Sequence, residues 1–298
     1  MQVKRIKRAI DGVLLLDKPL GLSSNQALQQ VKRLYQAAKA GHTGNLDPLA
    51  TGLLPICLGE ATKFSHYLLD ADKSYRALVK LGIVTSTGDA EGEVLSTSKA
   101  EVSLQAVSQA LQRLTGTIQQ VPPMYSALKH QGKALYEYAR AGVNIERPAR
   151  TVHIHQIQLN SYERDQLDIT VSCSKGTYIR TLAEDIGQIL GCGAHLAGLR
   201  RLSTAHFMLE EAHTLEQLQA ILPEARDSAL LPADAMISHL PKVELDADSA
   251  YYLRQGQSVW QSGLNLQGSF RLYVQGDFIG LGEQRPDGKI LPKRLIAT

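Results

Sequence analysis

Apolar positions along the chain alternate between strand-like and helix-like spacing. Continuous apolar runs at residues 12–16 and 53–58 predict buried strands of ordinary length. Strict alternation of apolar and polar residues predicts half-buried strands at 74–81 and 166–173, and a further strand at 151–159. A polar turn around residues 161–164 is expected to join the last two.

Helical spacing of apolar residues appears between these strands. It predicts helices at 103–114, at 179–190 and after the capping residues Ser23, Ser24 and Asn25, with shorter ones at 60–69 and 214–222. Strands and helices interleave without a repeated unit. The pattern therefore predicts an α+β fold but does not give the order of strands in the sheet.

The pattern changes near the C-terminus. Residues 223–235 read as a helical linker with Pro232 inside it, and from about residue 240 short apolar segments alternate with glycines. Residues 270–274 and 278–281 are predicted to be strands of a small barrel. We therefore expect a first domain over 1–235 and a second, β-rich domain over 240–298.

Composition and charge narrow the class of protein. The chain has 298 residues and a net charge of only +3, so any nucleic-acid site must be a local patch. Small basic clusters such as Arg200 with Arg201 are expected to be solvated surface. Three scattered cysteines favour a reducing compartment over a disulfide framework, and no apolar run approaches the ~20 residues of a membrane span. These features predict a cytoplasmic protein without a membrane segment.

One stretch, residues 41–52, reads GHTGNLDPLATG and presents a single acid, Asp47, among three glycines. The next acid along the chain is Glu60, so no local carboxylate pair of the glycosidase kind is present. Asp followed by Pro can also begin a helix, with Asp as its N-cap. Gly52 follows too soon for a useful helix, which favours a rigid loop that displays Asp47.

Two other segments carry candidate chemistry. Tyrosine and basic residues interleave over 122–140, which suits contact with unpaired RNA, although an ordinary surface helix would have a similar composition. His153 and His155 share a strand face, but no further ligand stands nearby at the spacing of a zinc site. No metal is expected.

Three blocks of sequence resemble a known family. Residues 41–63, the KGTYIR segment at 175–180 and residues 194–202 are similar to the motifs of the bacterial tRNA pseudouridine-55 synthases. Lys18 with Pro19 resembles another family motif, although a plain turn would explain it equally well. Asn45 departs from the pattern, since a small residue such as Ala or Ser is expected there.

The resemblance implies a role for six residues. Asp47 would be the catalytic residue and Arg180 its partner, while the substrate would be held by four others: His42, Tyr75, Tyr178 and Leu199. Each has a plainer explanation: a strand Tyr and a Leu are commonly core residues, and Arg180 could be a cation on a helix surface. An Arg would suit the pairing because it stays charged and presents a fixed fork to a carboxylate.

The family also implies a fold and a reaction. The fold would be a mixed, mainly antiparallel sheet flanked by helices, with residues 122–150 as a mobile thumb that closes on the T loop of tRNA and a C-terminal RNA-binding domain of PUA type. The reaction would isomerise uridine 55 to pseudouridine without a cofactor, in a monomer with no protein partner. Asp47 could attack ribose C1′, add to uracil C6 or remove the ribose 2′ proton. The alternatives are a non-catalytic tRNA-binding chaperone, which would not need Asp47, and a carbohydrate enzyme, which would need a second acid.

Overall fold

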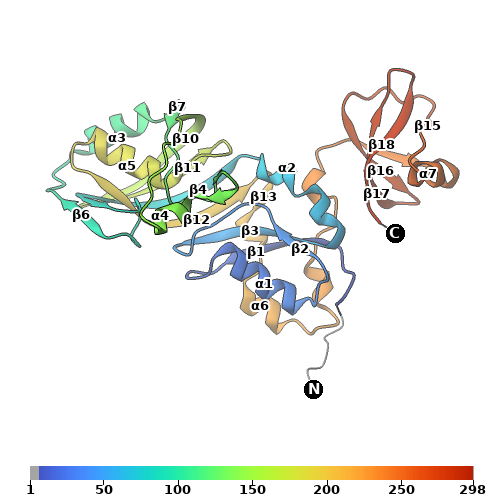
Figure 1. Ribbon diagram of the computed structural model, residues 1–298, viewed down its shortest axis with the longest axis horizontal. Coiled ribbons are helices and arrows are strands. Elements are labelled where there is room, and N and C mark those ends of the chain that lie inside the picture. The colour runs from blue at the N-terminus through green and yellow to red at the C-terminus, as the bar shows by residue number, and fades with distance from the viewer. Residues whose placement is uncertain (1–6, 298) are drawn as a thin grey trace.

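The computed structural model describes residues 7–297 and contains two main sheets (Figure 1). The expected domains over 1–235 and 240–298 therefore include seven residues, 1–6 and 298, that lie outside the described part of the chain. The larger sheet has nine strands and carries most of the helices, while the smaller has five strands and lies at one end of the molecule. The α+β prediction is confirmed.

The larger sheet is antiparallel except for one parallel pair, β12 with β3. Its main path runs β1 (Gly12–Lys18), β3 (Ala50–Leu58), β12 (Ala194–Thr204), β4 (Lys73–Leu81), β11 (Gln166–Cys173), β10 (Arg150–Glu163) and β7 (Gly116–Gln120). Two short strands extend it: β2 (Ala40–His42) pairs with β3, and β13 (Phe207–Met208) pairs with β12. Strands distant in sequence thus meet at the centre of the sheet.

Helices cover both faces of the sheet near β1 and β3, which explains the continuous apolar runs of these strands. Leu14 and Leu16 pack into one core, and Val13 and Leu15 into the other. The first core is covered by α1 (Ser24–Leu34), α3 (Leu104–Arg113), α5 (Ile179–Ile189) and α6 (Leu215–Ala220). The second is covered by the 3-10 helices η1 (Gly59–Phe64), η2 (Leu209–Glu211) and η4 (Ala235–Ile237), with α2 (His66–Leu69). A strand that is buried on both faces has no polar side to alternate with.

The smaller sheet has its own core, built around Phe270, Leu272 and Ile290. Its strand order is β14 (Lys242–Leu245), β16 (Ser269–Val274), β17 (Asp277–Gln284), β18 (Lys289–Leu295) and β15 (Val259–Trp260), with α7 (Ala247–Arg254) beside it. The rings of Phe64 and Phe278 meet edge to face at 5.4 Å and join the two parts. The sequence prediction missed α7, which has a short and weakly amphipathic pattern.

Two local predictions need correction. Residues 60–69 form η1 followed by α2 instead of one helix. Strand β10 continues through Glu163, so the turn is confined to Arg164 and Asp165. The loop predicted around Asp47 is confirmed, since a turn at residues 48–49 leads into β3 and no helix begins there. Arg164 adopts a φ of +56°, and this single left-handed residue lets the hairpin turn within two positions.

Residues 121–149 lie between β7 and β10, which pair directly with each other. The segment contains a small hairpin of β8 (Lys129–His130) and β9 (Lys133–Ala134), followed by α4 (Leu135–Arg140). Two other short elements, the β5 (Ile83–Thr85) and β6 (Val94–Thr97) hairpin and the 3-10 helix η3 (Arg226–Ala229), complete the described chain. Residues 121–149 thus form an insertion between β7 and β10, two strands that pair directly with each other.

Gly52 generates a stability prediction, since it adopts a φ of +99° and a Cβ there would lie 2.3 Å from the carbonyl oxygen of Arg201. We expect Gly52→Ala to lower the free energy of unfolding by about 3 kcal/mol or more, because the backbone strain (~1–2 kcal/mol) and the forced separation of β3 from β12 (~1–3 kcal/mol) act together. Gly191→Ala is the matched control: its φ is +73° and its Cβ would meet nothing within 4 Å. Urea unfolding of both variants measures the difference, and equal losses would contradict this account.

Candidate active site

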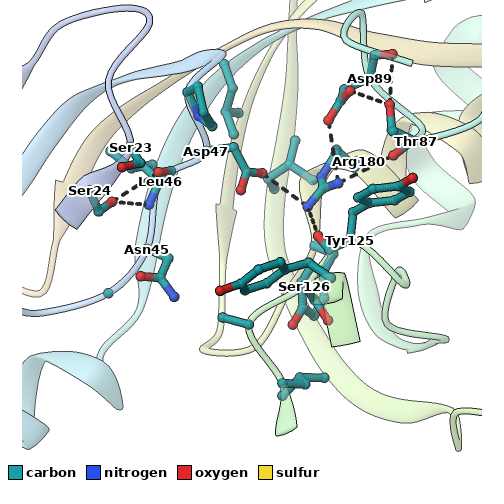
Figure 2. Close-up of a pocket in the computed structure, with 18 of the residues that line it drawn as sticks. Ser23, Ser24, Asn45, Leu46, Asp47, Thr87, Asp89, Tyr125, Ser126 and Arg180 are labelled. Carbon is teal, nitrogen blue, oxygen red and sulfur yellow. Dashed lines mark hydrogen bonds and ion pairs between the residues drawn. The ribbon is translucent and has the colours of Figure 1, made fainter. Parts of the chain in front are cut away.

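A cleft of about 1380 Å³ opens along the face of the larger sheet (Figure 2). Its lining comes from the loop before β3, the strands β4 and β12, the start of α5 and the insertion after β7. The structure brings together in this cleft all six residues to which the sequence comparison assigned a role: His42, Asp47, Tyr75, Tyr178, Arg180 and Leu199. Their separate roles are not decided by this placement.

The loop that carries Asp47 is clamped from outside. The N–H of Leu46 donates a hydrogen bond of 2.7 Å to Oγ of Ser24, and the N–H of Gly21 donates one of 2.9 Å to the carbonyl of Pro48. Ser24 begins α1 and Gly21 lies just before it, so both contacts tie the loop to the N-terminus of this helix. The loop is therefore fixed on both sides of Asp47, whose side chain remains 48% exposed to the cleft.

Arg180 lies in the first turn of α5, and its side chain is only 8% exposed. Its Nη2 lies 3.1 Å from Oδ2 of Asp47 and donates to the carbonyl of Tyr125 at 2.5 Å. Its Nη1 lies 3.5 Å from Oδ2 of Asp89 and donates to the carbonyl of Thr87 at 3.4 Å (Figure 2). The expectation of a solvated cation on a helix surface is wrong for this residue.

Asp89 is a site residue that the sequence analysis missed. It is 3% exposed, and its Oδ1 accepts hydrogen bonds from Oγ1 of Thr87 and, at 3.1 Å, from the N–H of Glu91. The sequence analysis treated residues 85–92 only as a turn-rich loop. The usable signal was a pair of acids, Asp89 and Glu91, between two glycines in a loop that follows the short strand β5.

The pKa of Asp47 is raised above its ordinary value. Desolvation by the surrounding protein is the largest cause, Arg180 opposes it, and the negative charge of Asp89 adds to it. The carboxylate is therefore less well stabilised than one in free solution despite its ion pair. Such a group retains more basicity and nucleophilicity than an ordinary surface Asp.

Two neighbouring strands supply the apolar wall of the cleft. Tyr75 on β4 pairs with Arg201 on β12, and Ala77 pairs with Leu199, so these four side chains share one face of the sheet. Tyr75 is 8% exposed and belongs to the main core as well as to the cleft. Tyr75 and Leu199 can therefore be core residues and still line the cleft, because the wall of the cleft is the edge of the core.

Tyr178 and His42 line the cleft from two further elements. Tyr178 precedes α5, and its backbone is held by the side-chain amide of Gln120, which accepts from its N–H at 3.0 Å and donates to its carbonyl at 3.3 Å. His42 ends β2, and burial lowers the pKa of its imidazole, so the ring is neutral at pH 7. Its Nδ1 is buried and has no hydrogen-bond partner among the described residues.

Lys18 is more than part of a plain turn. Its side chain is fully buried, and Nζ donates to the carbonyls of Pro19 at 2.9 Å and Leu22 at 2.5 Å. Burial lowers the pKa of Lys18 to about 8. These bonds hold the segment that leads into α1, the helix whose Ser24 clamps the Asp47 loop.

One of the two histidines that share a face of β10 meets an acid. His155 Nε2 lies 2.9 Å from Oδ2 of Asp72, and no group of three or more potential ligands occurs in residues 7–297. Within the same residues, every helix is too short or too polar to span a bilayer.

Solved structures with the same fold identify the class of protein. A Cbf5–Nop10–Gar1 complex contains a chain that matches 92% of this one and is itself covered to 78%, with a TM-score of 0.69 and 28% identity. A structure of an H/ACA RNP bound to a substrate RNA containing 2′-deoxyuridine gives a TM-score of 0.71 at 24% identity, covering 96% of this chain and 85% of that one. A mixed sheet of this kind, with a cleft Asp paired to a buried Arg, is the fold of a pseudouridine synthase, an isomerase.

Sequence relatives identify the family. The model of the TruB family pseudouridylate synthase N-terminal domain matches residues 32–179, and two models of TruB C-terminal domains match 180–238 and 241–296. A tRNA pseudouridine synthase B of Methylobacillus flagellatus is 66% identical over 99% of this chain and 98% of its own, and one of Pseudomonas aeruginosa is 55% identical over 100% and 99%. The chain belongs to the TruB family of pseudouridylate synthases.

The raised pKa of Asp47 generates a prediction about stability. Because the ionised carboxylate is disfavoured in the folded protein, we expect Asp47→Asn to have a higher free energy of unfolding than the wild type at pH 8. This advantage should shrink as the pH falls through the folded-state pKa and vanish near the ordinary Asp value of about 3.9. Denaturant unfolding between pH 8 and pH 5 measures the trend.

Asp168 provides the control of opposite sign. A hydrogen bond from Arg76 holds the pKa of Asp168 below its ordinary value, so Asp168→Asn should be less stable than the wild type at pH 8. A loss of stability in Asp47→Asn of the same sign as in Asp168→Asn would mean that the ion pair with Arg180 outweighs desolvation.

Proposed function

We propose that this protein converts uridine 55 in the T loop of tRNA to pseudouridine. The observation that carries the proposal is the exposed carboxylate of Asp47, held 3.1 Å from a buried arginine in a cleft walled by tyrosines. The names of the relatives, tRNA pseudouridine synthase B, support tRNA as the substrate. The three free cysteines agree with a reducing cytoplasm as its place of work.

The target base must leave the folded loop of the tRNA before it can react. In our proposal the flipped uracil stacks on Tyr75 and lies between Tyr178 and Leu199, all of which line the cleft. His42 contacts the loop nucleotides and helps to occupy the space that the base leaves. A neutral imidazole suits this position, because it can stack and hydrogen-bond without a charge.

The reaction is an internal rearrangement of the nucleoside. The bond between uracil N1 and ribose C1′ breaks, the base rotates, and C5 bonds to C1′ while the C5 proton is lost and N1 gains one. Asp47 would act by attack at C1′, by addition at C6 or by removal of the 2′ proton. Arg180 would fix the orientation of the carboxylate in each case, since its planar fork is itself held by two carbonyl groups.

A non-catalytic tRNA-binding chaperone would use the same surface. It would have no use for an acid whose charge is disfavoured by its surroundings and repels phosphates. Asp47 and Asp89 on either side of Arg180 therefore favour the enzyme.

The insertion would serve as a thumb over the T loop. Its Tyr125, Ser126, Leu128, Tyr136 and Arg140 line the cleft, and among residues 122–150 only Pro122, Ser126 and Leu135 are buried. So little buried surface supports our prediction that this segment moves in the free protein and becomes ordered on RNA. The small C-terminal sheet would add a second RNA contact of PUA type to a monomeric enzyme.

The proposed function is tested by assaying tRNA for pseudouridine after incubation with the protein alone. We expect Asp47→Asn to abolish turnover and to leave the affinity for tRNA within several-fold, because a carboxylate near phosphates contributes nothing favourable to binding. A tRNA with cytidine at position 55 serves as the substrate control. Pseudouridine formation by the variant well above background would refute the assignment of Asp47.

A second experiment tests the thumb. Lys129 and Lys133 are exposed on its hairpin, and each phosphate contact removed should lower the slope of log affinity against log salt by about 0.7–0.9. We expect Lys129→Ala with Lys133→Ala to flatten the slope by roughly one and a half units, with little change in turnover at saturating tRNA. Lys99→Ala with Arg113→Ala, two exposed cations outside the cleft, is the control. An unchanged slope in the thumb variant would exclude phosphate contacts by these lysines.

A further inference from the structure

Arg201 is a buried cation without a counter-charge. The residue is 1% exposed, and no carboxylate of residues 7–297 lies within ion-pair distance of its guanidinium group. Its Nε donates a hydrogen bond to the carbonyl of Leu53 at 2.6 Å. Its Nη2 is buried without any partner in the described chain. The expectation that Arg200 and Arg201 form a solvated surface pair is therefore wrong for Arg201.

The other buried cations of the described chain use their N–H donors in hydrogen bonds or ion pairs. Arg180 meets two carboxylates and two carbonyls. Arg226 donates from all three nitrogens to the carbonyls of Leu218, Leu34 and Ile221. Lys18 donates to two carbonyls. Arg201 by comparison meets one carbonyl and the Tyr75 hydroxyl but no carboxylate, and a buried charge without a counter-charge costs several kcal/mol.

The position of Arg201 indicates which groups of a bound substrate could accept hydrogen bonds from its guanidinium. It is paired with Tyr75 across the ladder between β12 and β4, and it follows Leu199 by two positions on the same face of β12. It lines the cleft together with both of them. Gly44 leaves room beside it, since a Cβ there would lie 3.6 Å from Nη1 of Arg201. The guanidinium also opposes the rise that burial causes in the pKa of Tyr75.

We propose that Arg201 is a further catalytic residue, which donates a hydrogen bond to a carbonyl oxygen of the flipped uracil and stabilises the negative charge that develops on the ring. When the bond between N1 and C1′ breaks, its electron pair stays with N1 and is delocalised onto O2 and O4. The charge disappears again when C5 bonds to C1′ and the C5 proton is lost. This inference rests on the proposed function.

The surroundings favour a base over a phosphate as the partner. Phosphates of the RNA backbone stay near solvent, whereas Arg201 lies against an aromatic ring and an aliphatic wall beneath the cleft opening. A planar base fits such a wall and brings carbonyl oxygens with it. A fixed donor in a site with little water is worth far more to a developing charge than the same donor in solution.

The first experiment measures single-turnover pseudouridine formation by Arg201→Gln on tRNA. We expect a loss of about 10²–10³-fold, the usual effect of removing one preorganised donor from a developing charge. Arg201→Lys, which keeps a cation without the planar fork, should fall between this variant and the wild type. Arg200→Gln is the matched control, because Arg200 lies on the other face of β12, pairs with Asp17 at 2.6 Å and does not line the cleft. It should react at close to the wild-type rate.

The second experiment separates a chemical role from a structural one. The target uridine is replaced by 2-thiouridine and by 4-thiouridine, since sulfur is a poorer hydrogen-bond acceptor than oxygen. If Arg201 contacts one of these carbonyls, the corresponding thio-substitution slows the wild type and has a much smaller effect in Arg201→Lys and Arg201→Gln. A purely structural role would give additive effects at both positions.

The outcomes distinguish the inference from the function on which it rests. A wild-type protein that forms no pseudouridine in tRNA would overturn the proposed function itself. An active wild type with additive thio effects at both carbonyls, or with Arg201→Gln near the wild-type rate, would overturn only the role of Arg201. Should Arg201→Gln not fold, as judged by circular dichroism, the comparison of the wild type with Arg201→Lys decides the question in the same way.

Discussion

One guanidinium group organises the cleft. Arg180 contacts three groups that lie in different segments. They are Asp47 in the loop between β2 and β3, Asp89 in the loop after β5, and the carbonyl of Tyr125 in the insertion after β7. These three segments are far apart in sequence. Arg suits the task because its planar fork offers donors in several fixed directions at once and keeps its charge when buried. Without this group the acid would still lie on its loop, but nothing would fix its direction.

The site carries groups that the folded protein does not stabilise. The carboxylate of Asp47 is disfavoured by its surroundings, and Nδ1 of His42 and Nη2 of Arg201 are buried without a hydrogen-bond partner among the described residues. Such unsatisfied groups are uncommon in native structures and are concentrated where a ligand completes them. All three line the same cleft, which is why we assign to the substrate the partners that the protein does not provide.

Much of this could be predicted from the sequence, for identifiable reasons. The strands β1, β3, β4 and β11 and the helices α1, α3 and α5 have strong periodic patterns, and Ser23 and Ser103 cap two of these helices as their side chains suggest. The motif around Asp47 is long enough to identify its family by itself. The burial of Arg201 and the importance of Asp89 could not be predicted, because an arginine in a basic pair and an acid in a polar loop look like surface residues.

The sequence by itself determined the family, the elements and the candidate acid, because these depend on spacing and composition within short segments. Only the tertiary structure decided which charges are buried and what they meet. Arg201 and Arg200 are neighbours in sequence, yet the alternation of β12 sends one toward the cleft and the other toward Asp17. The pairing of Arg201 with Tyr75 depends on the register between strands more than a hundred residues apart. That register is set by the packing of the whole sheet against its helices, which no local pattern encodes.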